Sequence, residues 1–193
     1  MGIGVSAYVL RWLLALPAGA ADMNRVANAI REASEAFARR LSGTTAALSA
    51  LVGGALFLAY GLRTSVSDPV SGLELGVWLL ISFALGTAGT IAIGEAATFV
   101  ATRGAVRTAS AARRSVDATL RASLRTGATT ALFATALSTA TMGGLYLAVL
   151  AYHGALGAEP SRALIVVPQI PMLLIGHALG ASFSALLSQI AGG

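Results

Sequence analysis

The chain has 193 residues, of which 56% are hydrophobic and only 11% are charged, and its mean hydropathy is +0.77. Soluble domains carry about 25% charged residues, so this composition points to helices in lipid, and the lack of Cys and Lys excludes disulfides, thiolate chemistry, Schiff bases and a P-loop. The net charge of +5 comes entirely from arginines, which alternate with apolar segments and therefore indicate membrane topology and no nucleic-acid partner.

Five apolar segments follow one another along the chain, and a spanning helix needs about 20 such residues. They are Ile3–Leu16, Thr44–Leu62, Leu75–Thr102, Thr126–Tyr152 and Ala163–Ala191. We predict an all-α, polytopic membrane helix bundle with about five transmembrane helices, forming one membrane domain over residues 1–193. The first segment is short and contains Arg11, and the small residues that follow it leave a cleaved signal peptide as an alternative.

The distribution of arginines predicts the orientation. Ten of the thirteen lie in the connections between the first and second segments and between the third and fourth, namely Arg25, Arg31, Arg39, Arg40, Arg103, Arg107, Arg113, Arg114, Arg121 and Arg125. Cytoplasmic loops are enriched in basic residues. We therefore expect the N-terminus outside and the C-terminus inside.

Both basic connections are predicted to be helical, near residues 23–41 and 103–125. In the first, Glu32 and Glu35 can pair with Arg31 and Arg39 across one turn, and Asp22 or Asn24 can cap the start. In the second, an apolar stripe is formed by Val106, Ala109, Val116, Leu120 and Leu124. The stripe suits either an amphipathic helix on the lipid surface or a spanning helix that continues into the cytoplasm. We favour the continuing helix, because neither Pro nor Gly interrupts residues 107–125.

Three polar residues within the apolar segments are candidate functional residues, since ionisable groups in a membrane are costly. Glu95 is a candidate proton-relay carboxylate, or it pairs with a cytoplasmic arginine. His177 is a candidate proton shuttle, or it hydrogen-bonds a neighbouring helix. Gln189 is neutral and lies near the end of the last segment. We assign no catalytic and no metal-binding residue, because no carboxylate pair, Ser-His-Asp set or Ser-Lys set can be assembled.

Small residues predict where helices approach closely, as they do in membrane bundles. The fifth segment contains a Gly-x-x-x-Gly pair, and the second, third and fourth each contain a pair of glycines next to or close to one another. These are Gly53, Gly54, Gly86, Gly89, Gly143, Gly144, Gly176 and Gly180.

Four stretches resemble, in order, the membrane-bound proton-translocating pyrophosphatases. The stretches are MNRVANAIREASEAFARRL (23–41), FALGTAGTIAIGEAATFVATRGAVRTASAA (83–112), SLRTGATTAL (123–132) and GASFSALLSQIAGG (180–193). The residues that match the family pattern include Glu32, Phe37, Gly86, Gly94, Arg107, Arg125, Gly180, Ser182 and Gly193. The match covers most of the chain and corresponds to the N-terminal quarter or so of the longer family chain.

The resemblance implies the N-terminal segment of a pump that couples pyrophosphate hydrolysis to proton movement, with Mg²⁺ as cofactor of the full-length family. It implies as partners the lipid bilayer, the remaining C-terminal helices and a homodimer partner, and it implies a place in the bacterial cell membrane. The carboxylate- and lysine-rich motifs that hold Mg²⁺–pyrophosphate in the family are absent, so we expect this chain alone to be inactive. Gln189 stands where the family has an arginine near its ion gate.

Two alternatives stay open. In the first, the chain is a degenerate, non-catalytic membrane scaffold or a pseudogene product. In the second, it is an unrelated small transporter that uses Glu95 and His177.

Overall fold

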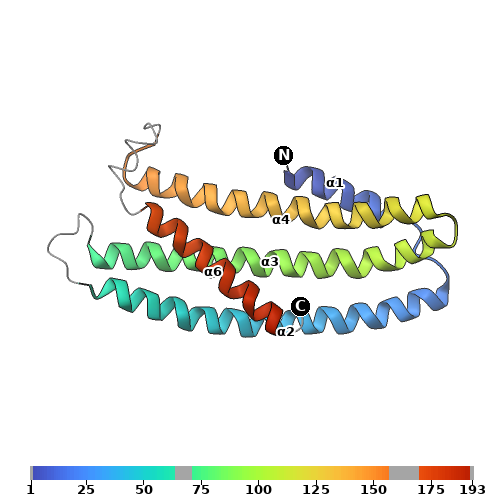
Figure 1. The fold of residues 1–193 in the computed structure, drawn as a ribbon, viewed down its shortest axis with the longest axis horizontal. Coiled ribbons are helices and arrows are strands. Elements are labelled where there is room, and N and C mark those ends of the chain that lie inside the picture. Colours follow the sequence, from blue (N-terminus) through green and yellow to red (C-terminus); the bar gives the residue numbers. More distant parts are fainter. Residues whose placement is uncertain (1, 64–70, 157–169, 192–193) are drawn as a thin grey trace. The chain divides into compact units, whose positions relative to one another are not determined.

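The computed structural model describes residues 2–63, 71–156 and 170–191, and within them it contains helices and no strand. The helices are α1 (Gly2–Ala15), α2 (Ala21–Gly61), α3 (Gly72–Ala112), α4 (Val116–Tyr152) and α6 (Ile170–Ile190) (Figure 1). The predicted all-α class is confirmed. The beginning of the fifth predicted segment, residues 163–169, lies outside the described residues.

Four of these helices, α2, α3, α4 and α6, are long and apolar enough to cross a bilayer. The first, α1, has only 14 residues, which at 1.5 Å per residue reach about 21 Å across a hydrocarbon core of about 30 Å. Pro17 follows directly, and proline in a helix interior removes a backbone hydrogen bond. The first predicted segment is therefore helical but falls short of a full span.

The connection predicted near residues 23–41 is helical, as expected, and it is continuous with the second segment. Together they make α2, a single helix of 41 residues that is about 60 Å long. The side-chain amide of Asn24 donates to the carbonyl oxygens of Gly19 and Ala20, both at 3.2 Å. This contact ties the helix start to the preceding loop, so Asn24 acts as a donor there and not as the predicted cap acceptor.

The predicted continuing helix is confirmed in α3, which extends past the third apolar segment to Ala112, but the expectation that nothing interrupts residues 107–125 is wrong. The chain turns at residues 113–115, between the end of α3 and the start of α4. Ser115 Oγ accepts a hydrogen bond of 3.1 Å from the backbone N–H of Ala118, which is the N-cap arrangement. Asp117 adds a carboxylate to the first turn of α4, where it faces the positive end of the helix dipole. Ser115 thus caps the start of α4 at a turn that contains neither Pro nor Gly.

The described chain divides into two compact units, each built from parts of the long helices. The first unit comprises residues 1–42 and 92–138. Within it α1 lies against α4, where Ser6 Oγ donates to the carbonyl oxygen of Thr129 at 2.9 Å. Leu13 is completely buried, so the short first helix is an integral part of this unit's packing.

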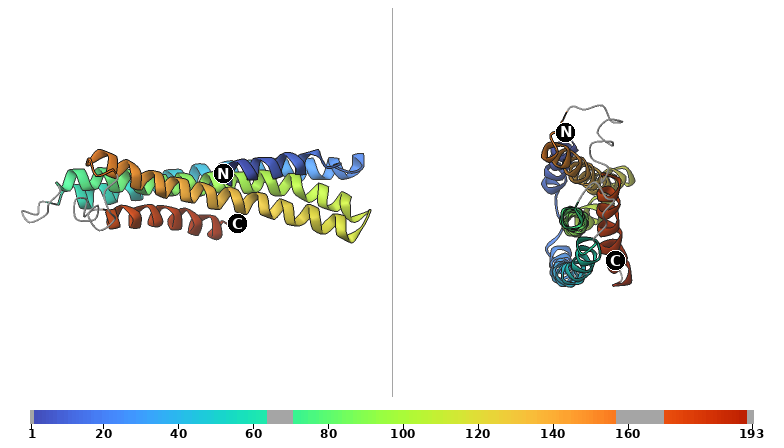
Figure 2. Two further views of the ribbon diagram at one scale, coloured as in Figure 1. Left: turned by 90° about the horizontal axis from the view of Figure 1, so that it is seen from above. Right: turned by 90° about the vertical axis from the view of Figure 1, so that its left-hand side faces the viewer.

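The second unit comprises residues 43–91 and 139–193, and in it α6 runs obliquely across one side of α3 (Figures 1 and 2). The hydroxyl of Ser82 donates to the carbonyl oxygen of Leu173, and that of Thr87 donates to Gly180 at 3.2 Å. Trp78 and Tyr152 pack edge to face with ring centroids 5.5 Å apart. The apolar core of this unit consists of Leu145, Val149, Leu150, Ala155, Ile170 and Leu173.

Glycines make this crossing close. A Cβ at Gly86 would overlap the carbonyl oxygen of His177, and one at Gly180 would overlap that of Phe83. A Cβ at Gly176 would lie 2.7 Å from a methyl group of Leu79. The predicted close approach is confirmed at these positions. It is not seen at Gly54, Gly143 and Gly144, where a Cβ would meet nothing within 4 Å in the described residues.

Candidate functional site

Glu95 lies on α3 in the first unit and lines a cavity of about 400 Å³. The same cavity is lined by the hydroxyl-bearing residues Ser6, Thr129 and Thr130 and by apolar side chains. Glu95 is exposed, and its side chain forms no ion pair or hydrogen bond with any other residue that the structure describes. The predicted pairing with an arginine is therefore not seen there, because the nearby Arg103 binds another carboxylate. The proton-relay role stays a prediction.

His177 lies at the crossing of α6 and α3 in the second unit and is only 7% exposed. Its Nε2 is 3.2 Å from Thr141 Oγ1 on α4. The neighbouring-helix hydrogen bond is thus present, and it links α6 to a second helix in addition to α3. A histidine that only fixes packing would look the same, so proton shuttling by His177 stays a prediction.

Gln189 lies in the last turn of α6 and is exposed. Its side chain forms no hydrogen bond with a described residue. The place of Gln189 near an ion gate therefore stays a prediction.

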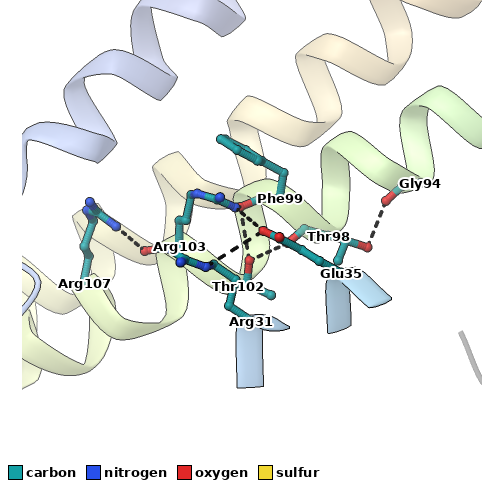
Figure 3. Close-up of polar contacts among 8 residues, drawn as sticks. All are labelled: Arg31, Glu35, Gly94, Thr98, Phe99, Thr102, Arg103 and Arg107. Atoms are coloured by element: carbon teal, nitrogen blue, oxygen red, sulfur yellow. Dashed lines mark hydrogen bonds and ion pairs between the residues drawn. The ribbon is translucent and has the colours of Figure 1, made fainter. Parts of the chain in front are cut away.

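A cluster of polar contacts joins α2 and α3 in the first unit (Figure 3). Arg103 donates to Glu35 Oε1 at 2.9 Å, and Arg31 reaches the same oxygen at 4.0 Å. The Arg103 guanidinium also lies 3.5 Å from the ring centroid of Phe99, a cation–π distance. The predicted local pair between Arg31 and Glu35 is confirmed, and the shorter contact to Arg103 adds a link between two helices.

Arg107, one turn beyond Arg103, fastens the end of α1. Its guanidinium donates to the carbonyl oxygen of Leu14 at 3.1 Å and to that of Arg103 at 2.8 Å. The last carbonyls of a helix lack partners within the helix, so Arg107 satisfies one of them. Burial, and after it the charge of Arg103, lowers the pKa of Arg107. An arginine in a protein keeps its proton, so the guanidinium stays charged in this partly buried place.

The residues that the structure describes contain no cluster of metal-ligand side chains. They include no group of three or more His, Asp and Glu side chains that could hold a metal ion, whereas Mg²⁺ requires near-octahedral oxygen ligands. The carboxylates already within ion-pair distance of a basic group are Glu35, Glu74 and Asp117.

Comparison with known proteins identifies the family. The family model for inorganic H+ pyrophosphatase matches residues 1–193. The chain belongs to this family. The resemblance read from four stretches of sequence is confirmed, and the apolar helices and the family together make the chain an integral membrane protein.

Three relatives of this pyrophosphatase-family chain are much longer than it is. The chain is 30% identical over 193 residues to pyrophosphate-energized membrane proton pump 3 of Arabidopsis thaliana, covering 98% of this chain and 24% of that protein. It is 29% identical over 187 residues to a K(+)-insensitive pyrophosphate-energized proton pump of Caldanaerobacter subterraneus, with 96% and 25% covered. It is 31% identical over 189 residues to K(+)-insensitive pyrophosphate-energized proton pump 2 of Moorella thermoacetica, with 98% and 24% covered.

The chain therefore spans about a quarter of the length of the relatives that it matches, and it corresponds to their N-terminal portion. No solved structure matches it significantly.

Sequence reasoning missed the contacts that are distant along the chain. Besides the link between Glu35 and Arg103, the guanidinium of Arg125 lies 3.6 Å from the ring centroid of Trp12. The sequence placed Arg103 and Arg125 in the basic connection near residues 103–125. Their partners, Glu35 and Trp12, could not be predicted, because residues so far apart in the sequence show no periodic pattern that would pair them.

Proposed function

We propose that this chain is the N-terminal segment of a pyrophosphate-energised proton pump, which couples pyrophosphate hydrolysis to proton translocation. The observation that supports this most strongly is the family match over all 193 residues. The names of the three relatives agree with it, and so does the share of their length that the chain spans. In this proposal the chain supplies packing helices, and the residues that bind pyrophosphate and Mg²⁺ belong to the remaining helices.

The proposal includes that the chain alone does not hydrolyse pyrophosphate. Pyrophosphate carries several negative charges, and metal ions held by several carboxylates neutralise such charge and orient the attacking water. The described carboxylates are dispersed, and three of them are engaged with basic groups. The partners proposed are the lipid bilayer, the remaining pump helices and a second copy of the pump.

We also propose that the protein lies in a bacterial cell membrane with its N-terminus on the outer side. The support is the gathering of arginines near residues 23–41 and 103–125, which the positive-inside tendency places in the cytoplasm. The turn between α3 and α4 would then face the cytoplasm.

Purification from the native membrane through a tag on this chain tests the proposal. The purified material, given Mg²⁺ and pyrophosphate in lipid vesicles, is expected to release phosphate and to acidify the vesicle interior. The 193-residue chain expressed alone is expected to release phosphate only at the background rate. Phosphate release by the isolated chain would contradict its role as a packing segment.

A second candidate function, a non-catalytic membrane scaffold, is favoured by one observation. Gln189 replaces the arginine that the family resemblance predicts, and it is exposed near the end of α6. Native material that binds neighbouring membrane proteins but releases no phosphate would support the scaffold and refute the pump.

A further inference from the structure

A basic pocket lies in the first unit where α1 ends beside the turn between α3 and α4. Its volume is about 180 Å³, many times the ~15 Å³ that admits one water molecule. Three arginines line it together with one carboxylate and several apolar side chains: Arg107, Arg114, Arg121, Asp117, Trp12, Leu16, Pro17, Ala111 and Ala118.

The charge of this lining is unbalanced. Asp117 pairs with Arg121 at 2.9 Å, which leaves the other two arginines without a carboxylate in the described lining. Arg114 is exposed and forms no ion pair within the described residues. Two cationic side chains that face one cavity repel each other, and a bound anion would relieve that repulsion.

Arg107 has unused hydrogen-bonding capacity at the same place. A guanidinium carries five N–H groups, and Arg107 uses two of them on backbone carbonyl oxygens. Its Nε is buried without a partner. A buried donor that stays unpaired costs free energy, so an acceptor in this pocket would be stabilising.

The rest of the lining suits a group with an apolar body. Trp12 lies in the last turn of α1, and tryptophan is enriched where apolar helices meet the headgroup region of a membrane. Leu16 and Pro17 continue the apolar wall. The pocket therefore combines cationic donors with an apolar wall, the two features that a phospholipid headgroup and the start of its acyl chains require. Basic pockets between helices on the cytoplasmic side bind anionic lipid headgroups in membrane proteins.

We propose that this pocket binds a phosphate group, with Arg107 and Arg114 as its donors. An anionic phospholipid is the expected source, and free inorganic phosphate is the other source with the same chemistry. The site is independent of pyrophosphate hydrolysis, so its test does not rest on the function proposed above.

The first experiment measures lipid retention. The protein is exchanged into nanodiscs with equal parts of phosphatidylglycerol and phosphatidylcholine, and lipids that remain bound are counted by native mass spectrometry. Wild-type protein is expected to keep one phosphatidylglycerol in preference to phosphatidylcholine. Arg114→Gln is expected to weaken that retention about tenfold, as the loss of one charge-assisted hydrogen bond does.

Arg113→Gln is the matched control, because it removes an equal charge from the same turn and Arg113 does not line the pocket. It is expected to retain lipid as wild type does. Because Arg114 and Arg113 are both exposed, neither substitution disturbs the packed interior, and circular dichroism checks that both variants keep their helices.

The second experiment separates the two sources. In lipid-free detergent, inorganic phosphate is added and heat unfolding is followed. If phosphate raises the unfolding temperature of wild type but not of Arg114→Gln, the site is supported and free phosphate is its occupant. Selective lipid retention that phosphate does not displace would support the site with a lipid as its occupant. The proposal is overturned if the Arg113 and Arg114 variants behave alike, or if wild type distinguishes neither phosphatidylglycerol from phosphatidylcholine nor phosphate from chloride.

Discussion

Replacing Gly86 by alanine should separate the helices of the second unit. The new Cβ would overlap the carbonyl oxygen of His177 and lie 3.0 Å from the backbone nitrogen of Ala181. These atoms belong to helix backbone, so the contact can be relieved only by moving α6 away from α3. Overpacking of this kind costs about 1–3 kcal/mol. The hydrogen bond from Thr87 to Gly180 would be strained as well, which adds about 0.6 kcal/mol in a membrane protein.

The matched control is Gly94→Ala on the same helix, where a Cβ would meet nothing within 4 Å in the described residues. Alanine gains about 1 kcal/mol over glycine in a helix at either position, so the difference between the two variants isolates the contact. We expect Gly86→Ala to be less stable than Gly94→Ala by about 1.5–3.5 kcal/mol.

The assay is reversible unfolding in mixed micelles by titration with sodium dodecyl sulfate. Trp78 lies in the second unit and packs against Tyr152, so its fluorescence reports on the affected part. Trp12→Phe in both variants removes the other tryptophan and its signal. Equal unfolding midpoints for Gly86→Ala and Gly94→Ala would refute the reasoning that backbone contact at the crossing limits the size of this residue.

Three further predictions follow from the first unit and from the proposed orientation. Glu35→Gln should destabilise the protein by about 0.5–1 kcal/mol, less at high salt, because the pair with Arg103 is partly exposed; the measurement is a double-mutant cycle with Arg103→Gln, and a zero coupling energy would contradict it. Arg113→Cys should react with a membrane-impermeant maleimide only after cells are permeabilised, and Leu62→Cys should react in intact cells. The chain has no natural Cys, so labelling in the reverse pattern would exclude the proposed cytoplasmic position of the turn between α3 and α4. Glu95→Gln should leave pyrophosphate-driven proton uptake unchanged if the chain serves as packing helices, and a loss of uptake in vesicles would instead assign the relay to this carboxylate.

Much of the fold could be read from the sequence because its signals are local. Long apolar runs predicted helices that can cross a membrane, and four of them have the required length. The pairing of Arg31 with Glu35 was predictable, since residues four apart share one side of a helix. Four stretches with the right residues in the right order were enough to identify the family.

The candidate site was less accessible to prediction. Glu95, His177 and Gln189 were chosen as polar residues in apolar segments, and the structure gives them different surroundings. His177 is buried and hydrogen-bonded to Thr141, Glu95 lines a cavity, and Gln189 is exposed. Burial depends on which side of a helix meets its neighbours, and hydropathy along the chain does not report that.

The sequence by itself determined that this is an all-helical membrane protein of the pyrophosphatase family, because span length, composition and motif order are properties of contiguous residues. Only the tertiary structure decided that Glu35 reaches Arg103, that Gly86 and Gly180 are contact glycines while Gly144 is not, and that arginines converge on the end of α1. These outcomes depend on the rotation and crossing of helices about one another. Side-chain packing sets that geometry, and residues far apart in the chain contribute to it.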